Sequence, residues 1–411
     1  MTHHDSGTAA APQPLEGLRV LDFSRVLAGP LCTQYLGDMG ADVVKVEAIG
    51  AGDDSRGWPV FRSTDTARRF GAPFLSANRN KRSLAIDLKS PEGIEACLKL
   101  ADQADVVVES FGPGVAARLG IDAQTLRARN PKLIVCCISG YGSIGPMREG
   151  KGYDVILQAF TGMLSITGEP GGPPMRSPFS PVDQATGLHA LIGILAALHA
   201  RQQTGVGQTI EASLFDTSAA FLGYFLQSYW ERGTEPVKPG AGHEALCPYD
   251  VFQAQDGPII LGVANDKLWR TFCRLAGLEA IMDLPEFSTN AQRVVNRATT
   301  VAHVSAVLKT RPRDRWIRDL DDAGIPCSPV HTLGEFSAHE HTTASGMVFG
   351  YQHPELGAMK GVSQPIRFEG ERTALRRPPP KPGQHSREVL AEIGYSDARI
   401  EQLRHQGVIG D

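Results

Sequence analysis

The chain has 411 residues, of which 42% are hydrophobic and 21% charged, a composition typical of a soluble globular protein with two or three domains. Its net charge is −4 and its basic residues are scattered, which argues against nucleic-acid binding because that function needs a concentrated basic face. No uninterrupted apolar run approaches the ~20 residues that cross a bilayer, so no membrane partner is expected. Seven cysteines without a CxxC pair, and a start that lacks a signal-peptide pattern, predict a reduced, cytoplasmic protein with a small-molecule ligand.

The first third of the chain repeats a strand–helix–strand pattern. Residues 18–23 predict a buried strand, residues 30–39 a helix and residues 42–47 a second strand. Further strands are predicted at 106–109 and 133–139. Because helical crossovers join parallel strands, these repeats predict an α/β fold with a doubly wound parallel sheet.

The strongest helix prediction covers residues 184–203, where leucine and isoleucine recur at helical spacing before Gly205. A loop rich in glycine and proline at 233–248 then leads into a predicted hairpin around Asp256 and Gly257, which indicates a second domain. Helices are predicted there at 266–276, 296–309 and 313–323. The predicted organisation is a flexible tail at 1–14, a large domain at 15–215, a linker helix at 216–232, a small domain at 233–330 and a segment at 331–411 that returns to the large domain.

A glycine-rich turn, Phe111-Gly112-Pro113-Gly114, follows a predicted strand and precedes a helical stretch with Arg118, a context in which backbone amides bind phosphate. The dinucleotide fingerprint requires a third glycine three residues after the second, whereas the next glycine here is Gly120. A nicotinamide or flavin site is therefore not supported. On the pattern alone, a plain strand-to-helix turn is the favoured interpretation.

Several basic side chains fall near predicted strand ends, where they could meet an anionic cofactor, although such residues are more often solvated surface charges. They are Arg25, Arg56, Arg79, Lys81 and Arg82. The twelve histidines form no HExxH motif and no zinc-like set with cysteine, so no metal is expected. His189 and His199 lie on the long predicted helix, where a core or boundary role is favoured. The absence of a GxSxG motif gives an α/β-hydrolase no support.

Asp183 stands just before the predicted helix at 184–203, a position typical of a helix N-cap. The helix dipole and the unpaired amides there also favour an ionised carboxylate, which is the form that a carboxylate nucleophile requires. The two interpretations are compatible, and local sequence alone favours the cap.

The segments GLRVLDFSRVLAGP at 17–30 and GADVVKVE at 40–47 closely resemble the opening of the family III coenzyme A transferases. Further motifs follow in that family's order and approximate spacing and extend the resemblance over nearly the whole chain. They are NKRS at 80–83, ESFGPG at 109–114, SGYG at 139–142, the segment from Asp183 to Leu198, TGVGQ at 204–208, GIPC at 324–327 and GQH at 383–385.

The resemblance implies a homodimer whose chains are interlocked like two rings, each with a Rossmann-like large domain and a smaller α/β domain. It implies that the active site lies between domains of different subunits, with Asp183 as the catalytic aspartate. Coenzyme A and its acyl thioesters would be substrates, with no permanently bound cofactor. The positions that match the family's coenzyme A site are Arg25, Ile86, Ser110, Phe111, Arg118 and Leu119.

The resemblance also gives the turn at 111–114 the role of a coenzyme A cradle. The formyl-CoA branch of the family carries His and Gln where this chain has Arg25 and Leu27, which argues against formyl-CoA and oxalate as substrates. The α-methylacyl-CoA racemase branch, the alternative activity, has a histidine base where this chain has Tyr153 and a glutamate where it has Asn265. A neutral phenol is a poor base at neutral pH, so transfer is favoured over racemisation.

The predicted function is transfer of coenzyme A from an acyl-CoA, such as succinyl-CoA, to a small carboxylic or dicarboxylic acid, through an anhydride and a thioester of Asp183. Arg176 and His243 are candidates for binding a second substrate carboxylate, although a surface charge and a loop histidine are the simpler interpretations. An alternative of another class is a non-catalytic acyl-CoA-binding protein, against which the presence of Asp183 argues.

Overall fold

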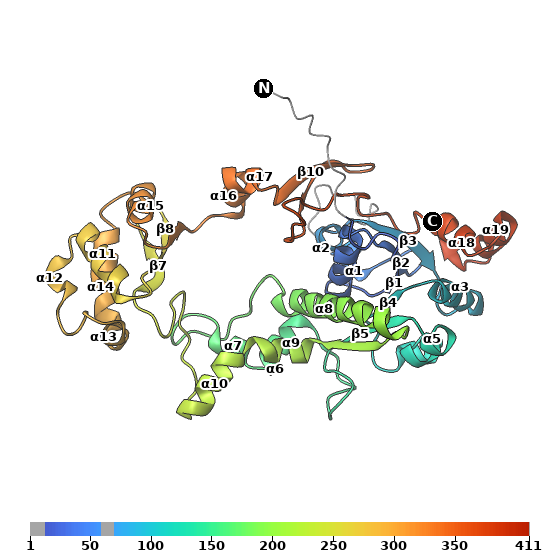
Figure 1. Cartoon of the computed structure of the whole chain (residues 1–411), viewed down its shortest axis with the longest axis horizontal. Helices are drawn as coiled ribbons and strands as arrows, with labels where there is room; N and C mark the ends of the chain where they lie inside the picture. Colours follow the sequence, from blue (N-terminus) through green and yellow to red (C-terminus); the bar gives the residue numbers. More distant parts are fainter. Residues whose placement is uncertain (1–12, 59–69, 411) are drawn as a thin grey trace, which may run out of the picture. The chain divides into compact units, whose positions relative to one another are not determined.

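The computed structural model describes residues 13–58 and 70–410, which divide into two compact units (Figure 1). The larger unit consists of the described residues up to Thr161, the segment Ser177–Gly223 and the chain from Glu340 onward. The smaller unit consists of Gly162–Arg176 and Tyr224–His339. Apart from residues 13 and 14, the predicted tail at 1–14 lies outside the described residues.

A seven-stranded sheet forms the centre of the larger unit, in the order β12-β3-β2-β1-β4-β5-β6. Neighbouring strands are parallel except for the antiparallel pair of β12 and β3. The order of the six parallel strands is that of a doubly wound sheet, which confirms the predicted α/β fold. The strands are β1 (Arg19–Phe23), β2 (Asp42–Glu47), β3 (Lys81–Ile86), β4 (Val106–Glu109), β5 (Ile134–Ser139), β6 (Thr209–Ser213) and β12 (Ile409–Gly410).

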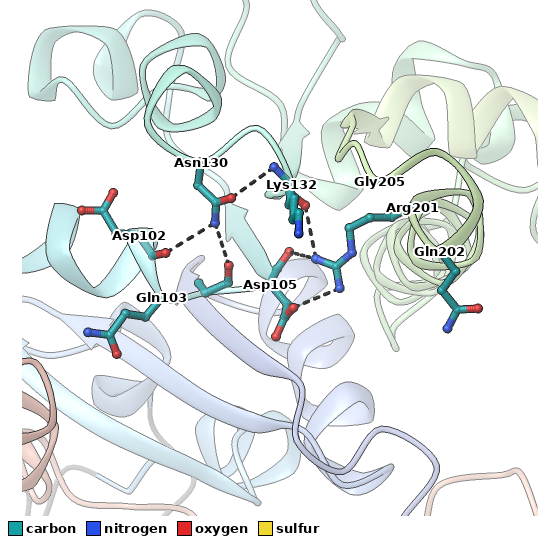
Figure 2. Close-up of a pocket in the computed structure, with 9 residues that line it drawn as sticks. Asp102, Gln103, Asp105, Asn130, Lys132, Arg201, Gln202 and Gly205 are labelled. Carbon is teal, nitrogen blue, oxygen red and sulfur yellow. Dashed lines mark hydrogen bonds and ion pairs between the residues drawn. The ribbon is translucent and has the colours of Figure 1, made fainter.

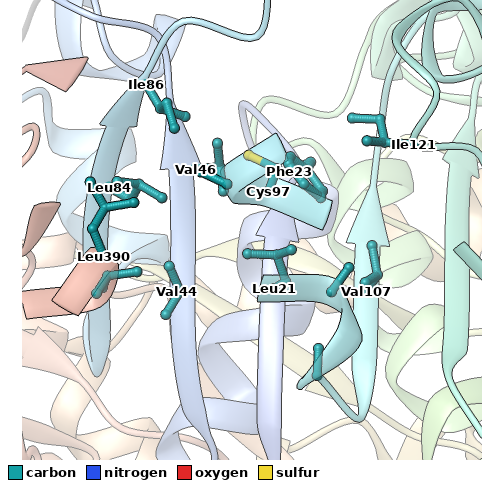
Figure 3. Packing of buried hydrophobic residues seen from close by; sticks show 14 of the residues in the cluster. Leu21, Phe23, Val44, Val46, Leu84, Ile86, Cys97, Val107, Ile121 and Leu390 are labelled. Carbon is teal, nitrogen blue, oxygen red and sulfur yellow. The ribbon is translucent and has the colours of Figure 1, made fainter. Parts of the chain in front are cut away.

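One face of this sheet is hydrophobic. Because successive strand residues point to opposite faces, alternate residues such as Leu21, Val44 and Leu84 enter a single cluster (Figure 3). Four helices supply the other side of the cluster, namely α3 (Pro91–Asp102), α5 (Ala123–Arg129), α18 (Ser386–Glu392) and α19 (Asp397–His405). The last two come from the end of the chain, which therefore completes the core of the larger unit.

The opposite face carries buried charges and is covered by α1 (Ala28–Asp38) and α8 (Pro181–Thr204), which pack together. Asp22 of β1 and Lys81 of β3 are fully buried and form an ion pair of 3.1 Å. Helix α1 completes their hydrogen bonds, because Thr33 donates to Asp22 at 2.6 Å and the carbonyl of Pro30 accepts from Lys81 at 2.8 Å. Buried charges need such partners, since each unpaired one would cost several kcal/mol.

Helix α8 begins three residues earlier than the predicted helix at 184–203 and ends at Thr204. Within the described residues it is the one helix whose length and apolar composition would suffice to cross a membrane, a test that the core helix of a soluble protein also passes. It buries Ala190, Leu191 and Ile194 inside the larger unit.

Shorter elements complete the larger unit. They are η1 (Asp54–Gly57), α2 (Ala72–Ala77), α4 (Val115–Leu119), α6 (Asp154–Phe160), α9 (Leu214–Phe221), α17 (Glu340–Ala344) and the antiparallel pair β10 (Val348–His353) and β11 (Gly357–Val362).

The smaller unit packs helices around two buried tryptophans and a three-stranded antiparallel sheet. Trp269 and Trp316 are each 0% exposed, and each indole N–H donates to a backbone carbonyl, of Met282 at 3.1 Å and of Leu308 at 2.9 Å. The predicted hairpin around Asp256 is confirmed as β7–β8. The elements are α7 (Met163–Ile166), α10 (Gly223–Arg232, which starts at the boundary), β7 (Tyr249–Gln253), β8 (Pro258–Gly262), α11 (Asp266–Ala276), α12 (Glu279–Met282), α13 (Asn290–Val295), α14 (Arg297–Leu308), α15 (Arg313–Asp322), β9 (Cys327–Pro329) and α16 (Leu333–Ala338).

Helices α1 and α8 are in tight contact at Gly187. A Cβ atom on this glycine would lie 2.4 Å from the carbonyl oxygen of Ala28, a distance that real contacts do not allow. The absence of a side chain at Gly187 therefore permits the helix pair.

Substitution Gly187→Ala is expected to lower the free energy of unfolding by about 1–3 kcal/mol, because the two helices must separate to admit the methyl group. Urea denaturation followed by circular dichroism measures this change. Gly223→Ala is the matched control, since a Cβ atom at Gly223 meets nothing within 4 Å and alanine favours a helix. Equal stability of Gly187→Ala and wild type would show that the helices do not depend on this close contact.

Candidate active site

The strand order predicts a ligand crevice at the centre of the sheet, beyond the carboxyl ends of β1 and β4. These strands are neighbours, and doubly wound sheets bind ligands where the strand order reverses, as it does between them. Arg25 follows β1 and Ser110 follows β4, and the Arg25 backbone N–H donates to the Ser110 hydroxyl at 3.0 Å. The rings of Phe23 and Phe111 lie 6.0 Å apart beside this contact. The structure thus brings three predicted coenzyme A residues to one edge of the sheet.

Arg118 and Leu119 lie on α4, directly after the glycine-rich turn. Gly114 has a φ of 70°, in the left-handed region that glycine adopts without strain. The Arg118 guanidinium is exposed and lies over the turn, 3.3 Å from where a Cβ atom of Gly114 would stand. This basic side chain is therefore available to an anionic ligand held by the turn.

Ile86 differs from the other predicted coenzyme A residues. Its side chain is only 1% exposed and belongs to the hydrophobic cluster of the larger unit. In addition, Ile86 pairs with Ile409 of β12 at the edge of the sheet. The whole residue, backbone included, is therefore covered by its neighbours in the described chain.

Asp183 is the third residue of α8, so the prediction that it is the N-cap is wrong. The N-cap position belongs to Ser180, which has a φ of 52° and makes no capping hydrogen bond with its side chain. The cap comes instead from Asp154 of α6, whose Oδ2 accepts from the backbone N–H groups of Val182 at 2.8 Å and Asp183 at 3.1 Å. The Asp183 carboxylate therefore does not cap the helix.

The same arrangement changes the protonation of Asp183. Burial, with the negative charge of the neighbouring Asp154 as a second cause, raises the pKa of the Asp183 carboxyl to about 7. The expectation that the helix terminus favours an ionised Asp183 is therefore wrong, because burial and Asp154 together favour the protonated form. Asp154 takes the helix amides for itself and adds a like charge beside them.

Packing of α8 on α1 positions Asp183. Residues four apart lie on the same face of a helix, so Asp183 shares a face with Gly187, which contacts Ala28 at the start of α1. Residues 24–27, the β1–α1 loop, lead directly into this contact. Asp183 and the residues after β1 consequently lie on the same side of the sheet.

Of the basic residues predicted near strand ends, only Arg25 has an exposed side chain, which pairs with Asp54 at 3.5 Å. The other four are buried in ion pairs, so they are neither solvated surface charges nor free for an anionic cofactor. The pairs are Arg56–Glu47 at 2.7 Å, Arg79–Asp38 at 2.6 Å, Lys81–Asp22 at 3.1 Å and Arg82–Asp42 at 2.5 Å.

Other singled-out residues have local roles. His189 forms a hydrogen bond of 3.0 Å with Thr217, in keeping with a boundary residue. Asn265 caps α11 by accepting from the N–H of Leu268. Tyr153 precedes Asp154 and is 66% exposed.

Arg176 and His243 belong to the smaller unit. Arg176 is exposed. The His243 Nδ1 atom accepts a hydrogen bond from the N–H of Ala245 at 3.1 Å, and its ring lies 5.7 Å from that of Tyr249. His243 is thus engaged within its own turn.

A pocket of about 430 Å³ lies at the opposite edge of the sheet, beside the last turn of α8 (Figure 2). Arg201 pairs there with Asp105 at 2.9 Å, and the Asn130 amide donates to the carbonyl of Ala104 at 3.3 Å. Arg201, which lines the pocket, lies 18 residues after Asp183 along α8, a separation of about 27 Å at 1.5 Å per residue. The pocket is therefore separate from the candidate active site.

Comparison with known proteins gives the same family as the sequence motifs do, over nearly the whole chain. The family model described as CoA-transferase family III matches residues 15–386. Succinyl-CoA:glutarate CoA-transferase of Mus musculus is 36% identical over 399 residues, which covers 97% of this chain and 90% of the mouse protein. Succinate–glutarate CoA-transferase of Agrobacterium fabrum is 38% identical over 383 residues, covering 92% of this chain and 96% of the bacterial protein.

A solved structure is similar over the same length. The crystal structure of a CAIB/BAIF family protein from Brucella suis matches with a TM-score of 0.83 at 35% identity, covering 93% of this chain and 100% of that one. The family model, the relatives and the solved structure thus agree over nearly the whole chain, and the chain belongs to CoA-transferase family III.

Proposed function

We propose that this CoA-transferase moves coenzyme A from succinyl-CoA to a small dicarboxylic acid, with Asp183 as the covalent nucleophile. The observation that carries the proposal is the position of Asp183. Its carboxyl group is half-buried and does not cap α8, because Asp154 caps that helix. It lies at the start of α8, on the helix face that meets α1.

In the proposed reaction, a carboxylate oxygen of Asp183 attacks the thioester carbonyl of succinyl-CoA. The C–S bond breaks, leaving a mixed anhydride and coenzyme A thiolate. The thiolate then attacks the aspartyl carbonyl of the anhydride, which releases succinate and forms a thioester between Asp183 and coenzyme A. The acceptor carboxylate repeats these steps in reverse, regenerating the Asp183 carboxylate and leaving as the new acyl-CoA.

The raised pKa of Asp183 fits this role. A carboxyl with a pKa of about 7 is a more basic, and therefore stronger, nucleophile than an ordinary aspartate with a pKa near 3.9, while about half of it is still ionised near neutral pH. Burial and Asp154 thus supply basicity without a separate general base.

Coenzyme A itself would occupy the crevice at the carboxyl ends of β1 and β4. We infer contacts from Arg25, Ser110, Phe111, Arg118 and Leu119, and Ile86 stays a predicted member of the set although the residue is only 1% exposed. Arg25 and Arg118 are exposed and can meet phosphate groups, and Phe111 offers an apolar surface beside them. The acyl-CoA is a substrate, and the mechanism needs no resident cofactor.

The names of the mouse and Agrobacterium relatives support succinyl-CoA as donor and glutarate as acceptor. A five-carbon dicarboxylate has a second carboxylate that needs a cationic or hydrogen-bonding partner. Arg176, which is exposed, and His243 remain the proposed partners.

We further propose that the active protein is an interlocked homodimer that completes the site at Asp183. The larger unit exposes several large apolar side chains, which is unfavourable unless another surface covers them. They include Ile144 at 89% exposure, Phe179 at 64%, Ile192 at 62% and Phe160 at 54%. Phe179 lies only four residues before Asp183, so a second copy covering it would also border the nucleophile.

Racemisation of a 2-methylacyl-CoA is the alternative activity. Tyr153 is exposed and Asn265 caps a helix, so the described residues supply neither of the racemase's two counterparts at these positions. A non-catalytic acyl-CoA-binding protein is the alternative of another class, and the experiment below separates all three.

Incubation with succinyl-CoA followed by hydroxylamine is expected to convert Asp183 into a hydroxamate, because hydroxylamine attacks anhydrides and thioesters. Mass spectrometry of the peptide that carries Asp183 measures the product, and Asp183→Asn should give neither the adduct nor transfer to glutarate. Wild-type protein that binds acyl-CoA but shows no adduct and no exchange would be a binding protein. Exchange of the α-hydrogen of a 2-methylacyl-CoA with deuterium, without an acceptor acid, would identify a racemase.

Activity and stability should respond to pH in opposite directions. Transfer should increase as pH rises through about 7, because Asp183 must be ionised. A folded-state pKa above the unfolded value means that stability is full below pH ~4 and falls as pH rises through the folded-state pKa. Asp183→Asn should therefore be more stable than wild type at about pH 8, with the difference shrinking toward about pH 5 in urea denaturation. Glu149→Gln, which removes an exposed carboxylate, controls for net charge, and a pH-independent difference would contradict the assignment.

Light scattering should give twice the mass of one chain. Because linked rings separate only when one of them unfolds, mixed tagged and untagged dimers should exchange subunits no faster than the protein unfolds globally. A monomeric mass, or exchange that is much faster than unfolding, would contradict the interlocked dimer.

A further inference from the structure

The β1–α1 loop, residues 24–27, holds a strained backbone. Val26 has a φ of 70°, in the left-handed region that β-branched residues avoid because of contacts between Cβ and the backbone. Such a conformation costs on the order of 1–3 kcal/mol and persists only where surrounding contacts impose it. The contacts around Val26 therefore indicate what holds the loop.

Three side chains each accept a hydrogen bond from one backbone N–H group of the loop. Asp22 accepts from Ser24 at 2.9 Å and Ser110 accepts from Arg25 at 3.0 Å. Asp53 accepts from Val26, with both carboxylate oxygens at 3.3 Å. The strained residue itself is thus held by Asp53.

A buried lysine joins Asp53 to the same loop. Lys45 of β2 pairs with Asp53 at 2.9 Å and also donates to the backbone carbonyl of Ser24 at 2.8 Å. Both side chains are 0% exposed. The pair therefore grips the loop from two sides, by an N–H of Val26 and by a C=O of Ser24.

Neighbouring groups fix the orientation of Asp53. Its backbone N–H donates to Glu47 at 3.0 Å, and Ser55 donates to its Oδ1 from both the backbone and the hydroxyl, at 2.9 and 2.6 Å. Burial alone would raise the pKa of Asp53, but Lys45 and Ser55 outweigh it and lower the pKa to about 2. Asp53 stays ionised and paired at any pH at which the protein would be assayed.

We propose that Asp53 and Lys45 are positioning residues that hold the β1–α1 loop in its strained conformation and so preset the coenzyme A crevice beside Asp183. This inference rests on the proposed function of the crevice. The ion pair touches the loop and no ligand, and it acts through Val26 and Ser24. Because the loop is strained, removal of the pair lets Val26 relax and moves Arg25 away from Ser110.

The test measures coenzyme A binding to the full-length protein by calorimetry, separately from transfer. Asp53→Asn should weaken coenzyme A binding about tenfold or more. In this variant the loop is relaxed before binding, so the free-energy cost of straining Val26 is added to the free energy of binding. Val26→Gly alone should stay within about threefold of wild type, since glycine adopts this φ without strain. In Asp53→Asn/Val26→Gly the dissociation constant should return to within about threefold of that of Val26→Gly.

Recovery by the glycine distinguishes positioning from simple loss of stability, which a glycine would not restore. Asp38→Asn is the matched control, because it breaks the largely buried pair with Arg79, for which no hydrogen bond to the loop is found among the described residues, and should leave coenzyme A binding unchanged. If Asp53→Asn does not fold, Lys45→Met/Asp53→Asn removes both charges together and takes its place.

Unchanged binding in the folded variant, or no recovery with Val26→Gly, would overturn the positioning role. A wild-type protein that binds coenzyme A but does not transfer it would overturn the proposed function alone. Normal transfer by wild type, together with unchanged binding in Asp53→Asn, would overturn the positioning role alone.

Discussion

The close approach of α1 and α8 at Gly187 is the contact on which the arrangement of the larger unit depends. With the Ala28 carbonyl against its Cα, Gly187 leaves no room for a side chain, so the register of the two helices is set at this point. Asp183 lies one turn before Gly187, and the β1–α1 loop ends one residue before Ala28. One steric constraint between two backbones therefore brings a carboxyl from the middle of the sequence to the end of the first strand.

Each of these two helices follows a non-glycine residue in a left-handed conformation. Val26 precedes α1 with a φ of 70°, and Ser180 precedes α8 with a φ of 52°. Carboxylates from elsewhere in the chain accept backbone N–H groups at both helix starts, Asp53 from Val26 and Asp154 from Val182 and Asp183. Burying such charges is expensive, and the fully paired network on the α1 face of the sheet offsets that cost.

Local periodicity was sufficient to predict β1, β2, β4 and β5 and the long helix α8, because their apolar residues follow helical or strand spacing. It was not sufficient for β3, whose sequence begins with Lys81 and Arg82. Those residues pass for surface charges unless their partners are known, and the partners Asp22 and Asp42 lie 59 and 40 residues away. Burial of charge is a property of the folded network and leaves no local signal.

The same limit applies to the candidate site. Asp183 could be selected from its motif. The prediction that it caps the helix was wrong, because the residue that does so, Asp154, lies 29 residues earlier in the chain. The motif around Tyr153 and Asp154 drew attention only to the tyrosine, although the aspartate is the residue that is buried. The coenzyme A contacts and the dimer stay predictions, since they involve a ligand and a second subunit. The domain bounds stay predictions as well.

The order in which the chain is made bears on how the larger unit reaches its final form. Its hydrophobic cluster includes Leu390, Ile400 and Ile409, and β3 receives its edge partner β12 only from the last described residues. On the ribosome, the six parallel strands can therefore be synthesised long before their core can close. The smaller unit is finished by His339, so its own cluster can form while the larger unit still exposes an apolar face and an open strand edge. At that stage the nascent chain exposes an apolar face and an unpaired strand edge, the features that favour aggregation.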